Sequence, residues 1–205
     1  MEGRISDSTV RRLSGYYRIL GELAGKGEST VSSYGLAQRA GVTPAQVRKD
    51  LSVFGHFGKR GTGYGVPQLR DEIKEILGLN QRWTVVLVGA GNLAHALFAY
   101  KEFEREGFEI RAVLDNDPAK IGQTWGGLSV EPVDRLAAIV AERKPDIGIV
   151  TTPAAAAQEV ADMLVEAGVT GILNFAPRKL FVPKHVHLRN VNLAIELESL
   201  SFALK

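Results

Sequence analysis

The sequence predicts an α/β fold in which a doubly wound parallel sheet follows a smaller, mostly helical domain. An apolar, β-branched run at 84–88 leads directly into Gly-Ala-Gly-Asn-Leu-Ala at 89–94 and then into a helical pattern. From there to residue 175, apolar strand patterns alternate with helical ones, which indicates parallel strands joined by right-handed crossovers. Residues 1–78 carry successive helical patterns instead, so we expect a separate domain there.

Composition excludes several classes of protein. The 205-residue chain is 45% hydrophobic and 23% charged, and it has no cysteine for a disulfide framework, a thiol nucleophile or a cysteine metal site. No apolar run approaches the roughly 18 residues that a membrane span requires, and the first residues lack the apolar core of a signal peptide. We therefore expect a cytoplasmic protein with no membrane partner and no bound metal.

Charge is distributed unevenly along the chain. Residues 1–80 hold 12 Lys and Arg against 8 Asp and Glu, a net charge of +4, whereas residues 81–205 carry −2. This asymmetry suggests different partners for the two parts, although ordinary surface variation also explains an excess of this size.

Two helices are predicted at the start of the first domain. Residues 7–25 place apolar side chains at helical spacing, and Asp7 is the expected N-cap. A second helix spans 33–40 and ends at Gly41, because glycine readily takes the left-handed conformation that stops a helix.

The start of a third helix is marked by three separate rules. Thr43 is a good N-cap, Pro44 suits the first helical position, and Gln46 stands where a capping box requires it. A helix is therefore expected from 44 to 54. The short, glycine-containing gap before it predicts a helix-turn-helix.

This third helix has one apolar face and one small, polar and basic face. Its apolar residues are Val47, Leu51 and Phe54. Its opposite face carries Ala45, Lys49 and Ser52, with Arg48 at the flank of that face. Small side chains let a helix approach the major groove, where a basic side chain reaches a phosphate or a guanine. A solvated helix face explains the same pattern equally well.

The next segment, 55–66, is rich in glycine and carries Lys59 and Arg60 at its centre. A glycine-rich hairpin with a basic tip suits the wing of a winged helix, because glycine lets the backbone approach a phosphate closely. A flexible loop between domains is the alternative. Pro67 and the helical pattern at 69–77 return the chain to the same domain, which favours the wing and puts the boundary near 78–82.

The glycine motif after the first strand is typical of a dinucleotide site. Gly89 permits the tight turn, Gly91 lets a pyrophosphate approach the backbone, and Ala94 is small enough for close packing of helix on strand. Asp115 ends the next apolar strand, at the distance expected for the acid that binds a ribose 2′-hydroxyl. A bare turn that binds no ligand is the alternative.

Further strands and helices complete this second domain. Strands are expected at 110–114, 146–151 and 171–175, and helices at 133–143 and 155–167. Ligands of parallel sheets bind at the carboxyl ends of the strands, which gathers residues 89–94, Asp115, Thr151–Pro153 and Asn174–Ala176 around one crevice. For Thr152 and Asn174, hydrogen bonding to their own loops is an equally good interpretation.

The tail ends in a predicted helix at 191–204. Apolar residues recur there at 193, 197, 200 and 204, as one helical stripe. A terminal helix with such a stripe must bury it, either on its own sheet or on a partner subunit.

The chain resembles the Rex family of redox-sensing bacterial transcriptional repressors over nearly its full length. The blocks that carry the resemblance are VTPAQVRKDLSVFGHFGKRG (42–61), VGAGNLAHAL (88–97), LDNDPAKIG (114–122), TTPAAAAQEVAD (151–162), GILNFAPRKL (171–180) and VNLAIELESLSF (191–202). The resemblance implies a winged-helix DNA-binding domain (1–78), a Rossmann domain for NAD(H) (79–186) and a C-terminal dimerisation helix (187–205) that is domain-swapped onto the partner.

The resemblance also implies a function. Members of the family bind palindromic operator DNA as homodimers and release it when NADH replaces NAD⁺, so we expect a repressor and not an enzyme. Two departures from the family pattern stand out. Ala94 occupies a position where glycine is more common, and Ser201-Phe202-Ala203 stands where many members have Tyr-Phe.

These arguments assign two sets of residues. Nucleotide binding is expected from Gly89, Ala90, Gly91, Asn92, Leu93, Ala94, Asp115, Lys120, Thr151, Thr152, Pro153, Asn174, Phe175, Ala176 and Phe202. DNA binding is expected from Ala45, Gln46, Arg48, Lys49, Ser52, Lys59, Arg60, Gly61 and Tyr64.

An NAD-dependent dehydrogenase with a helical accessory domain is the alternative function. A dehydrogenase needs an acid or base, usually His or Lys, beside the nicotinamide. None of the four histidines stands at the carboxyl end of a predicted strand; they are His56, His95, His185 and His187. A CoA-binding subunit would share the sheet, but it would leave residues 1–78 unexplained.

Overall fold

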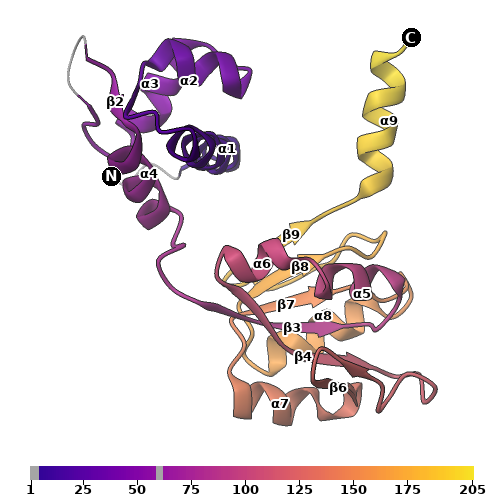
Figure 1. Cartoon of the computed structure of the whole chain (residues 1–205). Coiled ribbons are helices and arrows are strands. Elements are labelled where there is room, and N and C mark those ends of the chain that lie inside the picture. The colour runs from indigo at the N-terminus through magenta and orange to yellow at the C-terminus, as the bar shows by residue number, and fades with distance from the viewer. Residues whose placement is uncertain (1–4, 59–61) are drawn as a thin grey trace. The chain divides into compact units, whose positions relative to one another are not determined.

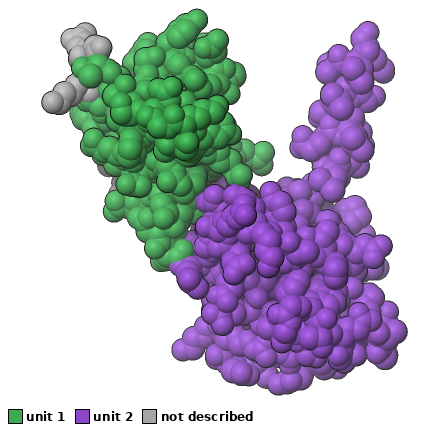
Figure 2. All heavy atoms as spheres, in the orientation of Figure 1, with its two compact units in different colours: residues 1–81 green, residues 82–205 purple. Residues whose placement is uncertain are grey.

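The computed structural model describes residues 5–58 and 62–205. The chain divides into two compact units, residues 1–81 (unit 1) and 82–205 (unit 2), each with its own apolar core (Figure 2). The division falls within the segment 78–82 in which the sequence places a boundary.

Unit 1 is a helical domain with a small two-stranded sheet. Its elements are α1 (Asp7–Gly25), β1 (Thr30–Val31), α2 (Ser33–Ala40), α3 (Pro44–Ser52), β2 (Tyr64–Gly65) and α4 (Val66–Ile76) (Figure 1). All four helices contribute to one core, which includes Leu13, Tyr16, Leu20, Leu36, Val47, Leu51, Leu69 and Ile73. Gly41 ends α2 with a φ of 66°, so the predicted helix-turn-helix is formed by α2 and α3.

The helix starts bring two corrections. The N-cap of α1 is Ser6 and not Asp7, because Ser6 has the extended backbone of a cap and its hydroxyl accepts from the amide of Thr9. Thr43 caps α3 as predicted, since its Oγ1 accepts from the amide of Gln46 at 3.1 Å. The capping box is only half formed, however, because the Gln46 side chain donates to Asp50 instead.

In the described parts of the glycine-rich segment between α3 and α4, Gly58 lies close to Gly63, and Gly63 lies close to Val31 of β1. A Cβ on Gly58 would collide with the carbonyl oxygen of Gly63, so the two arms of this segment touch through glycine backbones. Strand β2 then pairs antiparallel with β1, a strand that the sequence analysis did not predict. The predicted basic tip, Lys59, Arg60 and Gly61, lies outside the described residues.

Unit 2 is built on a seven-stranded sheet with the strand order β5-β6-β4-β3-β7-β8-β9. Its elements are β3 (Trp83–Val88), α5 (Asn92–Phe98), α6 (Lys101–Arg105), β4 (Phe108–Asp115), β5 (Thr124–Trp125), β6 (Leu128–Pro132), the 3₁₀ turn η1 (Val133–Arg135), α7 (Leu136–Arg143), β7 (Ile147–Val150), α8 (Ala157–Glu166), β8 (Gly171–Asn174), β9 (His187–Asn190) and α9 (Leu193–Ala203). All neighbouring strands are parallel except β5 and β6. This is the predicted Rossmann arrangement, with the chain reversing its direction of winding at β3.

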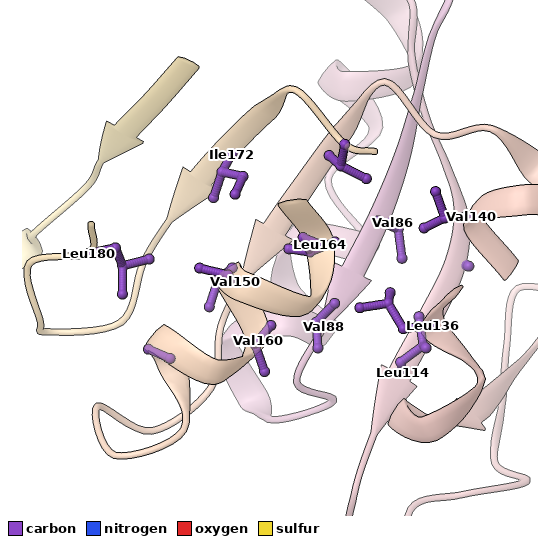
Figure 3. Packing of buried hydrophobic residues seen from close by; sticks show 14 of the residues in the cluster. Val86, Val88, Leu114, Leu136, Val140, Val150, Val160, Leu164, Ile172 and Leu180 are labelled. Carbon is purple, nitrogen blue, oxygen red and sulfur yellow. The ribbon is translucent and has the colours of Figure 1, made fainter. Parts of the chain in front are cut away.

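Helices cover the two faces of this sheet. Alternate residues of β3 face opposite sides, so Val86 and Val88 pack with α7 and α8, while Val85 and Leu87 pack with α5. Figure 3 shows the first of these cores, where Leu164 of α8 lies over the strands. The carboxyl ends of β3, β4, β7 and β8 consequently share one edge.

Four elements of unit 2 were not predicted. Helix α6 is short, the β5–β6 hairpin is joined by Gly126 and Gly127, and β9 begins four residues after Pro183. Strand β9 pairs with β8, so residues 187–190 belong to the sheet, whereas the sequence analysis had assigned them to the tail. Short edge elements give too few residues for a hydrophobic period to be visible.

Helix α9 does not pack into the apolar cores of the chain. None of its residues is buried, and Leu197, Phe202 and Leu204 are 68%, 81% and 80% exposed. Ile195 and Phe202 are exposed in addition to the predicted stripe, so apolar side chains project on several sides of the helix and not along one stripe. No helix within 5–58 or 62–205 is both long and apolar enough to cross a membrane.

Candidate functional site

The turn after β3 is fixed by contact with the loop after β7. Gly89 has a φ of 102°, which favours glycine, and a Cβ there would lie 2.9 Å from the carbonyl oxygen of Thr151. The Thr151 hydroxyl in turn donates to the carbonyl oxygens of Val88 and Gly89 at 3.0 and 2.8 Å. The first glycine of the motif and Thr151 therefore have structural roles that need no ligand.

The second glycine of the motif has no such structural role. Gly91 has an ordinary φ of −88°, and a Cβ built there would meet no atom within 4 Å. Neither strain nor packing within unit 2 explains a glycine here. The open space before the amino end of α5 fits the close approach of a phosphate to the backbone. Ala94, by contrast, is the buried residue of α5 and packs on the sheet, as the motif predicts.

Asp115 lies beneath the same turn, and its carboxylate is hydrogen-bonded to other groups of the chain. Its side chain is 6% exposed, and its carboxylate accepts from the amides of Ala90 and Asp117 at 2.6 and 2.8 Å and from Lys120 Nζ at 3.0 Å. Burial raises the pKa of Asp115, but the hydrogen bonds from Asp117, Ala90 and Lys120 outweigh it and hold the pKa below its ordinary value of 3.8. The carboxylate therefore joins the glycine turn to the end of β4.

A cavity of about 830 Å³ opens at the carboxyl ends of the strands. Nine of the predicted nucleotide residues line it: Gly89, Gly91, Leu93, Asp115, Lys120, Thr151, Thr152, Pro153 and Phe175. Eleven further residues line it that the sequence analysis did not select, among them Asn116, Asp117, Asp134, Glu159 and Met163. A cavity of this size at this edge of a parallel sheet suits a nucleotide.

The structure gives Thr152 and Asn174 different roles with respect to ligand binding and loop capping. The Oγ1 of Thr152 is buried at the cavity and has no hydrogen-bond partner among the residues that the structure describes, so it is available to a ligand. Asn174 is 1% exposed, and its amide holds the following loop through the carbonyl oxygens of Arg178 and Ala176 and through Asn190. Loop capping is thus the role that the geometry gives Asn174.

The other predicted nucleotide residues do not line the cavity. Ala90, Ala94 and Ala176 are buried in the apolar cores of unit 2, and Asn92 is exposed on α5. Phe202 lies on α9 and is 81% exposed, so the chain does not bring it to the crevice.

The second candidate surface is the outer face of α3. Ala45, Arg48, Lys49 and Ser52 are exposed, and Val47 and Leu51 are buried, as predicted. Arg48 is held at the start of α2 by donating from Nη1 to Ser33 Oγ at 3.0 Å. Tyr64 is a correction, because the pairing of β2 with β1 turns its ring into the core, where it is 9% exposed and burial raises its pKa.

A buried carboxylate anchors α3 to α1, and the sequence analysis missed it. Asp50 is 2% exposed and accepts from Arg12 Nε and Nη2 at 2.6 and 2.7 Å, from the Tyr16 hydroxyl at 2.9 Å and from Gln46 Nε2 at 2.7 Å. Burial raises the pKa of Asp50, but the donors Arg12, Gln46 and Tyr16 outweigh it and hold the pKa below 3.8. A charged residue on the buried face of a predicted helix was the available signal.

Comparison with known proteins agrees with both surfaces. A family model described as "CoA binding domain" matches residues 80–178, and one described as "Putative DNA-binding protein N-terminus" matches residues 4–52. The redox-sensing transcriptional repressor Rex of Desulfitobacterium hafniense is 53% identical over 199 residues, covering 97% of this chain and 95% of the relative. The chain belongs to the Rex family of redox-sensing transcriptional repressors.

Solved Rex-family structures share the whole fold. The crystal structure of RSP in complex with NAD⁺ and operator DNA matches with a TM-score of 0.94 at 39% identity, covering 98% of this chain and 93% of that one. RSP in complex with NADH matches with a TM-score of 0.91 at 37% identity, covering 98% and 95%. These full-length matches do not favour the CoA-binding subunit, which shares only the sheet.

Two glycine variants separate structural from ligand-binding roles in the turn. Gly91→Ala is expected to change the free energy of unfolding by less than about 1 kcal/mol and to weaken NADH binding by roughly tenfold or more, because the methyl group fills the space before α5. Gly89→Ala should lose about 1–3 kcal/mol from its φ and its contact with Thr151. Urea unfolding and calorimetric titration measure both; unchanged NADH affinity in Gly91→Ala would contradict the assignment.

Low pH should weaken the ion pair between Asp50 and Arg12 that joins α3 to α1. Because the pKa of Asp50 is lower in the folded than in the unfolded chain, its contribution to stability is complete well above pH 3.8 and is lost as the pH falls through the folded-state value. Asp50→Asn should lower the free energy of unfolding by about 3 kcal/mol at pH 7. This difference from wild type should shrink between about pH 5 and pH 3.

Urea titrations at several pH values measure that difference. Asp71→Asn, an exposed position on α4, is the matched control and should change stability by less than about 0.5 kcal/mol. A difference between wild type and Asp50→Asn that stayed constant down to pH 3 would show that folding does not lower the pKa of Asp50.

Proposed function

We propose that this protein is a cytoplasmic repressor that binds palindromic operator DNA as a homodimer and releases it when NADH replaces NAD⁺. The observation that carries the proposal is the full-length match to RSP, which binds operator DNA together with NAD⁺ in one structure and NADH in another. A repressor must reach DNA, which supports the cytoplasm as its location.

The DNA contacts are proposed for the outer face of α3 and the segment that follows it. Arg48 and Lys49 project from α3 and can reach guanines or phosphates, while Ala45 and Ser52 permit close approach. Lys59 and Arg60 are proposed to lie along the phosphate backbone, because their segment is flanked by glycines.

NAD⁺ and NADH are proposed to occupy the cavity at the edge of the sheet. The amino end of α5 and Gly91 would receive the pyrophosphate, and Asp115 with Lys120 would lie at the ribose of the adenosine. The free hydroxyl of Thr152 would serve as a hydrogen-bonding group for the ligand. No histidine is among the described residues that line the cavity, and the lysine that lines it, Lys120, is paired with Asp115, which supports a sensor over a dehydrogenase.

The homodimer is proposed to form through α9. The exposed apolar side chains of α9 are expected to be buried by a partner. A second copy of the chain can bury them if α9 of one copy packs on the sheet domain of the other. Phe202 would then cap the nicotinamide in the partner's site. An apolar cap favours the neutral ring of NADH over the positive ring of NAD⁺, because burying an unpaired charge is costly.

A titration of operator binding against the two nucleotides tests the proposal. Fluorescence anisotropy on a palindromic DNA site should give at least tenfold weaker binding with saturating NADH than with NAD⁺, and operator DNA should weaken NADH binding by the same factor. Binding should also decline steeply with salt. Equal operator affinity with either nucleotide would contradict the redox response, and absence of any sequence-selective DNA binding would contradict the repressor.

A further inference from the structure

Gln46 is the one residue of α3 with a side-chain amide, and its orientation is fixed from inside the domain. It lies in the first turn of α3, where recognition helices make most of their contacts to bases. Its Nε2 donates to Asp50 Oδ1 at 2.7 Å. An ionised carboxylate only accepts hydrogen bonds, so the amide nitrogen and not the oxygen must face Asp50.

Asp50 cannot easily turn to a different partner. Arg12 holds both carboxylate oxygens and the Tyr16 hydroxyl adds a third donor, at distances between 2.6 and 2.9 Å, while the residue is 2% exposed. The Asp50 carboxylate, which accepts from Gln46, is therefore held in place by α1. Because this carboxylate does not move, it fixes the orientation of the Gln46 amide.

This arrangement leaves a defined set of groups on Gln46. Its Oε1 has no hydrogen-bond partner in the described part of the chain, and one of the two hydrogens on Nε2 is unused. In the major groove, an acceptor beside a donor matches the N6 amino group and N7 of adenine. Guanine offers two acceptors there, O6 and N7, and leaves a fixed amide oxygen without a donor.

We propose that Gln46 is a specificity-determining residue that reads an adenine in each operator half-site, and that Asp50 is the positioning residue that fixes its amide for this contact. The inference rests on the proposed function, because it requires α3 to enter the major groove. It assigns to the buried Asp50 cluster a role in base selection in addition to its role in holding α3 on α1.

Selection of binding sites from random-sequence DNA by the full-length chain is the first measurement. Wild type should select a palindrome with an adenine at one position per half-site that Gln46→Met no longer selects, while the preferences at all other positions persist. Gln68→Met is the matched control, because Gln68 makes the same type of contact, Nε2 to Glu72 Oε1 at 3.1 Å, on the exposed side of α4. It should select the wild-type palindrome.

The second measurement replaces that adenine by purine, which lacks the N6 amino group. The replacement should weaken wild-type binding by about 5- to 150-fold and Gln46→Met binding by less than about twofold, in anisotropy titrations on synthetic operators. Asp50→Asn should fall between them, with an unchanged salt dependence, because phosphate contacts do not depend on the amide. If Asp50→Asn does not fold, Gln46→Glu replaces it and should shift the preference toward cytosine.

The outcomes separate this inference from the proposed function. If wild type enriches no sequence, the repressor function itself fails. If wild type and Gln46→Met select the same palindrome, or if the lost preference is for a G·C pair, the repressor function stands and the role of Gln46 is overturned.

Discussion

The exposed apolar surface of α9 determines how the proposed dimer forms and how it responds to nucleotide. Six large apolar side chains on or beside this helix, Leu193, Ile195, Leu197, Leu200, Phe202 and Leu204, are each at least half exposed. Burial of one such side chain is worth about 1.5–3 kcal/mol, so together they can hold a stable dimer. A helix that is apolar on several sides must be surrounded, and a second copy of the sheet domain can surround it while bringing Phe202 to a nucleotide.

Each unit is organised around one buried carboxylate with a lowered pKa. Asp50 joins α3 to α1 through Arg12, and Asp115 joins the glycine turn to the end of β4 through the amide of Ala90. In both places a buried charge fixes a surface that must meet a ligand; Asp50 lies beneath its surface, whereas Asp115 also lines its cavity. Because such a surface is already ordered, little conformational entropy is lost when a ligand binds.

The sequence allowed most of the fold to be predicted, since long periodic helices and the strand–glycine–helix motif leave clear patterns. It also placed Gly89, Thr151 and Asp115 at one edge of the sheet. It did not reveal that the Asp115 carboxylate is hydrogen-bonded within the chain, that Tyr64 faces the core or that Gln46 donates a hydrogen bond to Asp50. These depend on contacts between residues far apart in the chain, such as Arg12 with Asp50, or on the pairing of the two-residue strands β1 and β2, which no local period reports.

In the proposed dimer, α9 couples two copies of the chain and thereby couples nucleotide binding to DNA binding. Deletion of residues 192–205 tests it most directly, with light scattering for the mass in solution and anisotropy for operator binding with NADH and with NAD⁺. The truncated chain is expected to be a folded monomer that has lost operator affinity by at least tenfold and no longer distinguishes the two nucleotides. A truncated chain that remained dimeric and still released operator DNA with NADH would contradict it.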